Sequence, residues 1–148
     1  MIQYIDMHAV LQESISGVYA DLVTRPTGRV VRERIERAIA GRGGGEVTVA
    51  RMDFTGVGCM DYSCADEIVA KLLRDRPAVL VLSGITDGHR EAIEPVLSGH
   101  GLAALLERAD GTLEGLGAAA AAAALLDELV ARRLAARMPG GTYALTLA

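Results

Sequence analysis

A short stretch in the middle of the chain gathers hydroxyl, thiol and carboxyl side chains that could do chemistry. It reads DYSCADE, and its candidate site residues are Asp61, Tyr62, Ser63, Cys64, Asp66 and Glu67. Side chains of these types can act as nucleophiles, phosphate acceptors, metal ligands or helix caps. Each of these functions needs its own neighbours, so the surrounding sequence decides among them.

Nucleophilic catalysis by Ser63 or Cys64 would need an activating base. A helix N-terminus would favour the Cys64 thiolate. The histidines, however, are scattered along the chain at His8, His89 and His100, and no motif surrounds them. A small hydrolase is therefore the weakest of the function classes that the sequence allows.

The same stretch gives little support to a metal or cofactor site. Hard cations need six or more oxygen ligands from a defined loop, which these acidic residues do not supply. The glycines Gly56 and Gly58 precede the stretch without the lysine of a phosphate-binding loop. We therefore expect no metal and no cofactor.

Helix capping explains the stretch more simply. Ser63 would be the N-cap, with Asp66 three residues later in the place of the capping-box glutamate. Negative charge in the first turn of a helix also suits the helix dipole. On this interpretation Ser63 is mainly structural, and Tyr62, Cys64, Asp66 and Glu67 lie at or near an exposed helix start.

The elements around the stretch predict an α/β fold. The segments EVTVARMDF and AVLVLSG are predicted strands, and the unbroken apolar run of the second indicates burial on both faces. Apolar residues at helical spacing lie between them, so the two strands should be parallel with a right-handed crossover. The result is a small mixed or mostly parallel sheet with helices.

Other elements follow from periodicity and from turn residues. We expect helices over residues 8–23, 26–40, 87–100 and 118–137, a short helix after residue 101, and strands over 1–5, 112–116 and 142–148. Thr86 or Asp87 should cap the helix that begins near residue 87. The GRGGG run at residues 41–45 should end the helix over residues 26–40.

Composition limits the classes of partner. The 148 residues carry a net charge of −4, with a pI near 5.3, so nucleic acid is an unlikely partner and a polyanionic membrane equally so. The cysteines Cys59 and Cys64 match no zinc spacing. The N-terminus lacks the features of a signal peptide, and no stretch reads as a membrane span. We expect a soluble, cytoplasmic protein.

Several motifs resemble the STAS domain of anti-sigma factor antagonists and sulfate transporters, and most closely the STAS-like family of unknown function. The similarity rests on DFTGVGCMD and SCADE, with LVTRPTGRVVRERIE upstream and GITDGHREAIEPVL downstream. It covers about residues 20 to 117, so residues 1–117 form the expected STAS-like domain and residues 118–148 a C-terminal helical appendage.

This resemblance implies a non-enzymatic regulatory module that binds a protein. In the family, the strand-to-helix junction docks a histidine-kinase-like (GHKL-type) ATPase that doubles as an anti-sigma factor, and a Ser or Thr after a conserved Asp is phosphorylated. Here Tyr62 follows Asp61, and Ser63 is one residue further on. Ser63 and Tyr62 are thus the possible phosphorylation sites, although the substitution puts the phosphoswitch in doubt.

The appendage allows two further hypotheses. Its helix and the following TYALT resemble the last helix and wing of a winged-helix DNA-binding domain, with Arg132, Arg133 and Arg137 near the wing. A transcription regulator is therefore the alternative function. The helix also carries an apolar stripe that must be buried, either against its own domain or against a second copy of the chain, and of these two we favour the homodimer. The stripe consists of Leu125, Leu126, Leu129, Val130 and Leu134.

Overall fold

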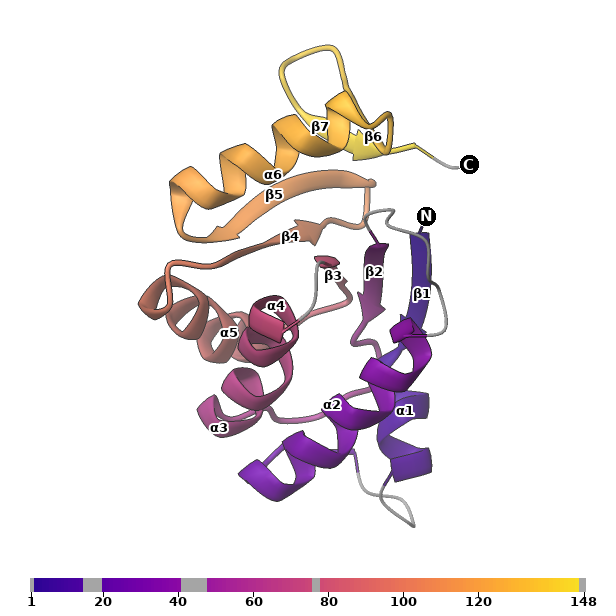
Figure 1. Cartoon of the computed structure of the whole chain (residues 1–148), viewed down its shortest axis with the longest axis vertical. Helices are drawn as coiled ribbons and strands as arrows, with labels where there is room; N and C mark the ends of the chain where they lie inside the picture. Colours follow the sequence, from indigo (N-terminus) through magenta and orange to yellow (C-terminus); the bar gives the residue numbers. More distant parts are fainter. Residues whose placement is uncertain (1, 15–19, 41–47, 76–77, 147–148) are drawn as a thin grey trace.

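The computed structural model describes residues 2–14, 20–40, 48–75 and 78–146, and it confirms an α/β fold. Within these residues, seven strands form one mixed sheet that curls into a half-barrel (Figure 1). The strands are β1 (Ile2–Asp6), β2 (Thr48–Asp53), β3 (Ala78–Ser83), β4 (Ala103–Glu107), β5 (Thr112–Gly117), β6 (Ala135–Arg137) and β7 (Tyr143–Leu145).

The sheet has a parallel half and an antiparallel half. Its order is β1-β2-β3-β4-β5-β7-β6, in which β1 to β4 run parallel and the remaining neighbours antiparallel. The predicted parallel pairing of β2 with β3 is confirmed, with Met52 opposite Leu82. All four carboxyl ends of the parallel strands therefore meet along one edge.

Helices cover both faces of the sheet. Around the parallel half lie α1 (Met7–Ser14), α2 (Arg25–Ala40), a helix in three parts and α5 (Asp87–Gly99). The three parts are α3 (Tyr62–Ala65), the π-helical segment η1 (Asp66–Ala70) and α4 (Lys71–Asp75). The opposite face receives α6 (Ala119–Ala131), which contacts β4 and β5.

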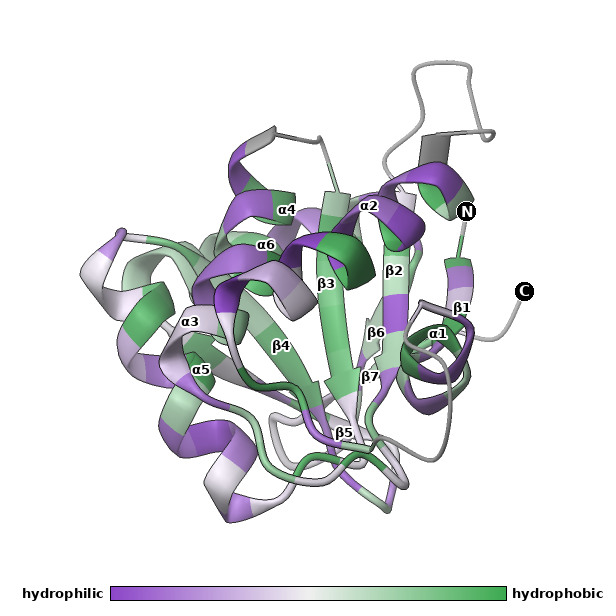
Figure 2. Ribbon diagram, turned by 90° about the horizontal axis from the view of Figure 1, so that it is seen from below, coloured by the Kyte–Doolittle hydropathy of each residue, from purple (hydrophilic) through white to green (hydrophobic). Residues whose placement is uncertain are grey.

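Alternation along the strands divides the interior into two apolar cores. Met52 and Leu82 belong to the core under α1 to α5, whereas Val49, Val79 and Val81 belong to the core under α6. Figure 2 shows β3 as a green, apolar strand, and its four central residues are buried. The predicted burial of β3 on both faces is thus confirmed.

The stripe of the C-terminal helix packs within the chain. Leu129 is fully buried in the second core, and Leu125, Leu126, Val130 and Leu134 pack against that core. Strand β7 pairs with β5, so the predicted terminal strand joins the main sheet. Intramolecular packing therefore covers the stripe that suggested a homodimer, and the homodimer stays a prediction.

Three predicted elements differ from the structure. The helix expected over residues 8–23 ends at Ser14, and Leu22 instead forms a bridge with Met60; residues 15–19 lie outside the described residues. The short helix expected after residue 101 is strand β4, which forms a hairpin with β5 around Gly111 at φ +87°. Pairing with β3 overrides the helical propensity of this Leu- and Ala-rich segment.

The helix expected over residues 118–137 stops at Ala131. Arg133 adopts φ 62°, and the Leu134 N–H bonds the Leu129 carbonyl at 2.8 Å, as in a Schellman motif. The usual signal for this ending is glycine, which the sequence lacks at this position. The helix ending predicted at GRGGG lies in residues 41–45, outside the described residues.

Candidate functional site

The loop between β2 and α3 leads into the predicted site, which begins at Asp61 and continues through α3 into η1. Hydrogen bonds hold this loop to the segment around Leu22. Its Cys59 carbonyl accepts from the Leu22 N–H at 2.7 Å, and the Asp61 N–H donates to the Leu22 carbonyl at 3.0 Å. The Gly58 N–H reaches the Ala20 carbonyl at 2.7 Å. Residues 20–22, which sequence periodicity assigned to a helix, therefore hold this loop in place through backbone hydrogen bonds.

Asp61, rather than Ser63, is the N-cap of α3. Its Oδ1 accepts from the Cys64 N–H at 2.9 Å and from the Ser63 hydroxyl at 2.7 Å. Its Oδ2 accepts from the Thr24 N–H at 3.0 Å. The capping box predicted for Ser63 and Asp66 is therefore wrong, because the helix begins two residues earlier and a long-range bond to Thr24 completes the cap.

The cap also fixes the charge of Asp61. Burial opposes ionisation, but the hydrogen bonds from the Cys64 N–H, the Ser63 hydroxyl and the Thr24 N–H outweigh it and lower the pKa of Asp61. Asp61 is therefore a carboxylate at neutral pH. Phosphorylation of Ser63 would remove the hydrogen bond that the Ser63 hydroxyl donates to Asp61.

Tyr62 is the exposed member of the predicted site. Its side chain is 60% exposed at the first position of α3, although large apolar side chains usually pack inside. Asp66 is half-buried, with an oxygen 2.8 Å from Arg25 and another 3.1 Å from His100. Tyr62 is therefore open to solvent, and Asp66 only in part.

Cys64 and Glu67 are buried, which corrects the expectation that both lie exposed at the helix start. The Cys64 thiol donates to the Thr24 carbonyl at 3.1 Å. Burial, reinforced by Asp61, raises the pKa of Cys64 to about 12. At neutral pH it is a thiol, and this argues against Cys64 as a nucleophile.

Glu67 is a buried carboxylate that organises a group of cations. Its Oε2 lies 2.6 Å from the Lys71 Nζ and 3.2 Å from Arg25, and its Oε1 lies 3.6 Å from Arg29 and Arg32. Burial works against its ionisation, but the bonds from Lys71 and Arg25 lower the pKa of Glu67 nonetheless. Glu67 therefore joins α2 to the η1 segment.

The histidines are engaged elsewhere. His89 is 1% exposed; its Nδ1 accepts from the Thr86 N–H at 3.1 Å, and its Nε2 then donates to the Gly58 carbonyl at 2.6 Å. Thr86, one of the two caps predicted, is the N-cap of α5, since its hydroxyl accepts from the His89 N–H at 3.1 Å. Among the described residues, no hydrogen bond joins a histidine to Ser63 or Cys64.

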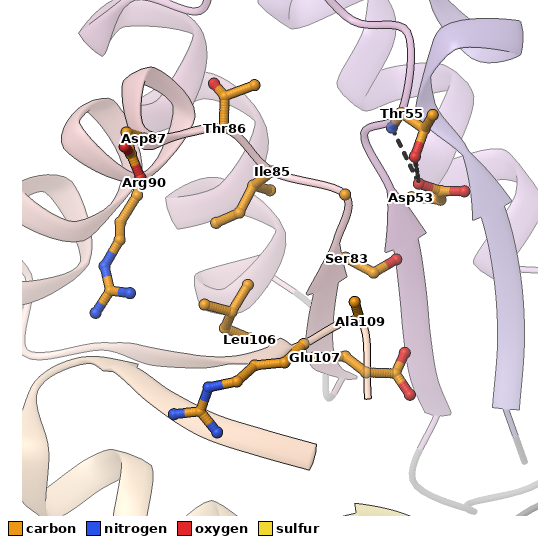
Figure 3. A pocket seen from close by; sticks show the side chains of 12 residues that line it. Asp53, Thr55, Ser83, Ile85, Thr86, Asp87, Arg90, Leu106, Glu107 and Ala109 are labelled. Atoms are coloured by element: carbon orange, nitrogen blue, oxygen red, sulfur yellow. Dashed lines mark hydrogen bonds between the residues drawn. The ribbon is translucent and has the colours of Figure 1, made fainter. Parts of the chain in front are cut away.

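Sequence reasoning missed a pocket at the carboxyl ends of β2, β3 and β4. It has a volume of about 490 Å³, and Asp53, Ser83 and Glu107 lie on its walls (Figure 3). Adjacent parallel strands that each end in a polar residue were the available signal. Both of these carboxylates have partners outside the pocket lining: Glu107 accepts from Arg51 at 2.7 and 2.9 Å, and Asp53 accepts from the Tyr4 hydroxyl at 2.8 Å.

A second pocket, which we call the α5 groove, borders Tyr62. It has a volume of about 790 Å³ and lies between Tyr62 and the exposed face of α5 that bears Asp87, Glu91 and Glu94. An adjoining pocket shares Glu91 and includes Asp21 and Met60. The predicted site was confined to residues 61–67, whereas the structure adds α5 beside it.

The arginines of the predicted winged-helix tail are exposed. Arg132 pairs with Glu128 at 3.2 Å, and the Arg137 guanidinium lies 5.7 Å from the centre of the Tyr143 ring. Helix α6 presents its apolar face to the sheet, and the β6–β7 hairpin extends that sheet.

Comparisons with protein-family models, curated proteins and solved structures find no match to this chain. Among the described residues, no helix is long and apolar enough to cross a membrane. In the same part of the chain, no group of three or more His, Cys, Asp or Glu side chains is arranged to hold a metal ion.

Proposed function

We propose that this chain is a non-enzymatic regulatory module, similar to STAS anti-sigma factor antagonists, that docks a protein partner at the β2–α3 junction. The observation that carries the proposal is Tyr62, a 60% exposed aromatic side chain at the start of α3, directly after a loop that is hydrogen-bonded to the segment around Leu22. Exposed tyrosines supply large contact area at low entropic cost and are enriched among residues that dominate binding energy.

The surroundings of Tyr62 support docking over covalent chemistry. The thiol of Cys64 is buried with its pKa raised, and the Ser63 hydroxyl is bonded to the Asp61 carboxylate rather than to a base. A fixed loop also loses little conformational freedom on binding, which favours affinity. The site is thus built for recognition.

The partner class that we propose is a histidine-kinase-like ATPase, on the sequence resemblance to STAS antagonists. Phosphorylation of the junction would be weak or absent, because Tyr62 occupies the acceptor position and Ser63 is half-buried. Regulation would then depend on partner concentration or nucleotide state rather than on a phosphoserine.

Site-specific photo-crosslinking tests this function. A benzoylphenylalanine replaces Tyr62 in the native cell, and a matched chain carries it at Met138, which is 43% exposed on the β6–β7 turn. We expect a protein of the ATPase class to be captured from position 62 and not from position 138. Capture from neither position, or equally from both, would overturn the proposal.

The alternative is a transcription regulator whose tail contacts DNA, favoured by the exposed Arg132, Arg133 and Arg137. It predicts binding to random duplex DNA with a steep salt dependence that these three arginines supply. Fluorescence anisotropy of a labelled duplex distinguishes the two, since the docking module would show no such binding.

A further inference from the structure

The α5 groove beside Tyr62 has an unusual charge distribution. Three carboxylates, Asp87, Glu91 and Glu94, face it together with a single cation, Arg90. The Arg90 guanidinium is already shared, with Nε 3.4 Å from Glu94 and Nη2 3.1 Å from Glu114. The groove therefore carries an excess of negative charge.

Two of these carboxylates have no partner within the described residues. Asp87 and Glu91 are both exposed, and neither forms a hydrogen bond or ion pair with another described side chain. They are four residues apart on α5, a spacing at which like charges repel and destabilise a helix. Pairing with a cation from outside would relieve this repulsion.

An aromatic ring completes the groove. Tyr62 lies on its opposite side, on α3, and an exposed ring face attracts a guanidinium more than a neutral group. Arginine suits such a site because its planar head can stack on the ring and still donate hydrogen bonds to carboxylates. The adjoining pocket with Asp21 and Glu91 extends the acidic lining.

We propose that the α5 groove receives a basic segment of the protein partner, in which an arginine stacks on Tyr62 and pairs with Asp87 and Glu91. This inference rests on the proposed docking function and specifies the chemistry of the docked surface. It also gives a function to the exposed Asp87 and Glu91 side chains of α5.

A peptide probe tests the groove directly. The probe is acetyl-Gly-Arg-Gly-Arg-Gly-Arg-Gly-amide, titrated into the ¹⁵N-labelled full-length chain, and the same peptide with citrulline in place of arginine is the charge control. We expect the arginine peptide to shift the amide resonances of Tyr62, Asp87 and Glu91. The citrulline peptide should leave them in place.

Matched variants make the test specific. D87N/E91Q should weaken binding of the arginine peptide by about fivefold to tenfold, since two exposed ion pairs are lost. E33Q/D127N removes the same charge from exposed positions on α2 and α6, and it should change binding by less than about twofold. Equal weakening by both pairs, or shifts spread away from the groove, would overturn the inference.

The peptide test and the crosslinking test can fail independently of each other. Capture of a partner at position 62 without groove binding of the arginine peptide overturns the inference alone. Groove binding of the peptide without capture at position 62 supports the basic preference and overturns the docking function.

Discussion

At the scale of single residues, Asp61 determines the conformation of the junction. One carboxylate receives hydrogen bonds from a backbone N–H of α3, a side-chain hydroxyl and the distant Thr24 N–H. Charge-assisted bonds of this kind are about twice as strong as neutral ones. Because Tyr62 is the first residue of the helix that Asp61 caps, these bonds also fix the position of the Tyr62 backbone.

Asp61→Ala should therefore lower the free energy of unfolding by about 2 kcal/mol, the upper end of N-cap substitutions. Ser63→Ala should cost about 0.5 kcal/mol, because it removes one donor while the cap remains. Urea denaturation of both variants measures the difference. A larger loss from Ser63→Ala would return the cap to Ser63.

Acid should destabilise the protein by protonating carboxylates that, like Asp61, are hydrogen-bonded or ion-paired in the folded state. The pKa values of Asp53, Asp61, Asp66 and Glu67 are lowered in the folded state. The unfolded chain then binds more protons, so this stability is present above about pH 4.5 and is lost as the pH falls through the folded pKa values.

Urea melts between pH 7 and pH 3 check this dependence. Asp61→Asn should flatten the acid limb of the profile, because the amide cannot be protonated in this range. A stability that stays level down to pH 3 in the unmodified protein would contradict the assignment.

At the scale of elements, α2 packs against η1 and fixes the position of the helix that carries the site residues. Gly28 of α2 lies so close that a Cβ there would be 3.0 Å from the Glu67 Cβ. Glu67 then completes the contact by pairing with the three α2 arginines, Arg25, Arg29 and Arg32. Over Asp66–Ala70 the helix widens to a π turn, a distortion common near functional sites.

Glu67→Gln should lower the free energy of unfolding by about 2 to 3 kcal/mol, since hydrogen bonds between charged groups are lost from a buried position. Asp66→Asn, at a half-buried position, should cost about 1 kcal/mol or less. Thermal denaturation, followed by circular dichroism, compares the two variants. Equal, small effects would mean that Glu67 is not the hub of this contact.

The sequence predicted elements whose signal is local and missed those set by distant contacts. β3 was predictable because burial on both faces requires an unbroken apolar run. The N-cap was placed at Ser63 because the pattern of a capping box fits there, whereas the bond to the Thr24 N–H that favours Asp61 is tertiary. The burial of Cys64 and Glu67 depends on Gly28 of α2, which no periodicity reveals.

At the scale of the whole molecule, the C-terminal segment covers the second core. Leu129 is fully buried there, and its helix α6 contacts β4, β5 and β6. Deleting residues 118–148 would expose the apolar face of the sheet, so we expect that truncated chain to aggregate or unfold. Light scattering and circular dichroism check this, and a folded, monomeric truncation would contradict it.

The central claim is that Tyr62 is the main contact with a protein partner. Isothermal titration calorimetry with the crosslinked partner, once purified, measures it most directly. The matched control is Tyr4, which is 58% exposed against 60% for Tyr62 but lies on β1. We expect Tyr62→Ala to weaken binding by about 2 kcal/mol, or roughly thirtyfold, and Tyr4→Ala to change it by less than about twofold. Equal affinities for the two variants would contradict it.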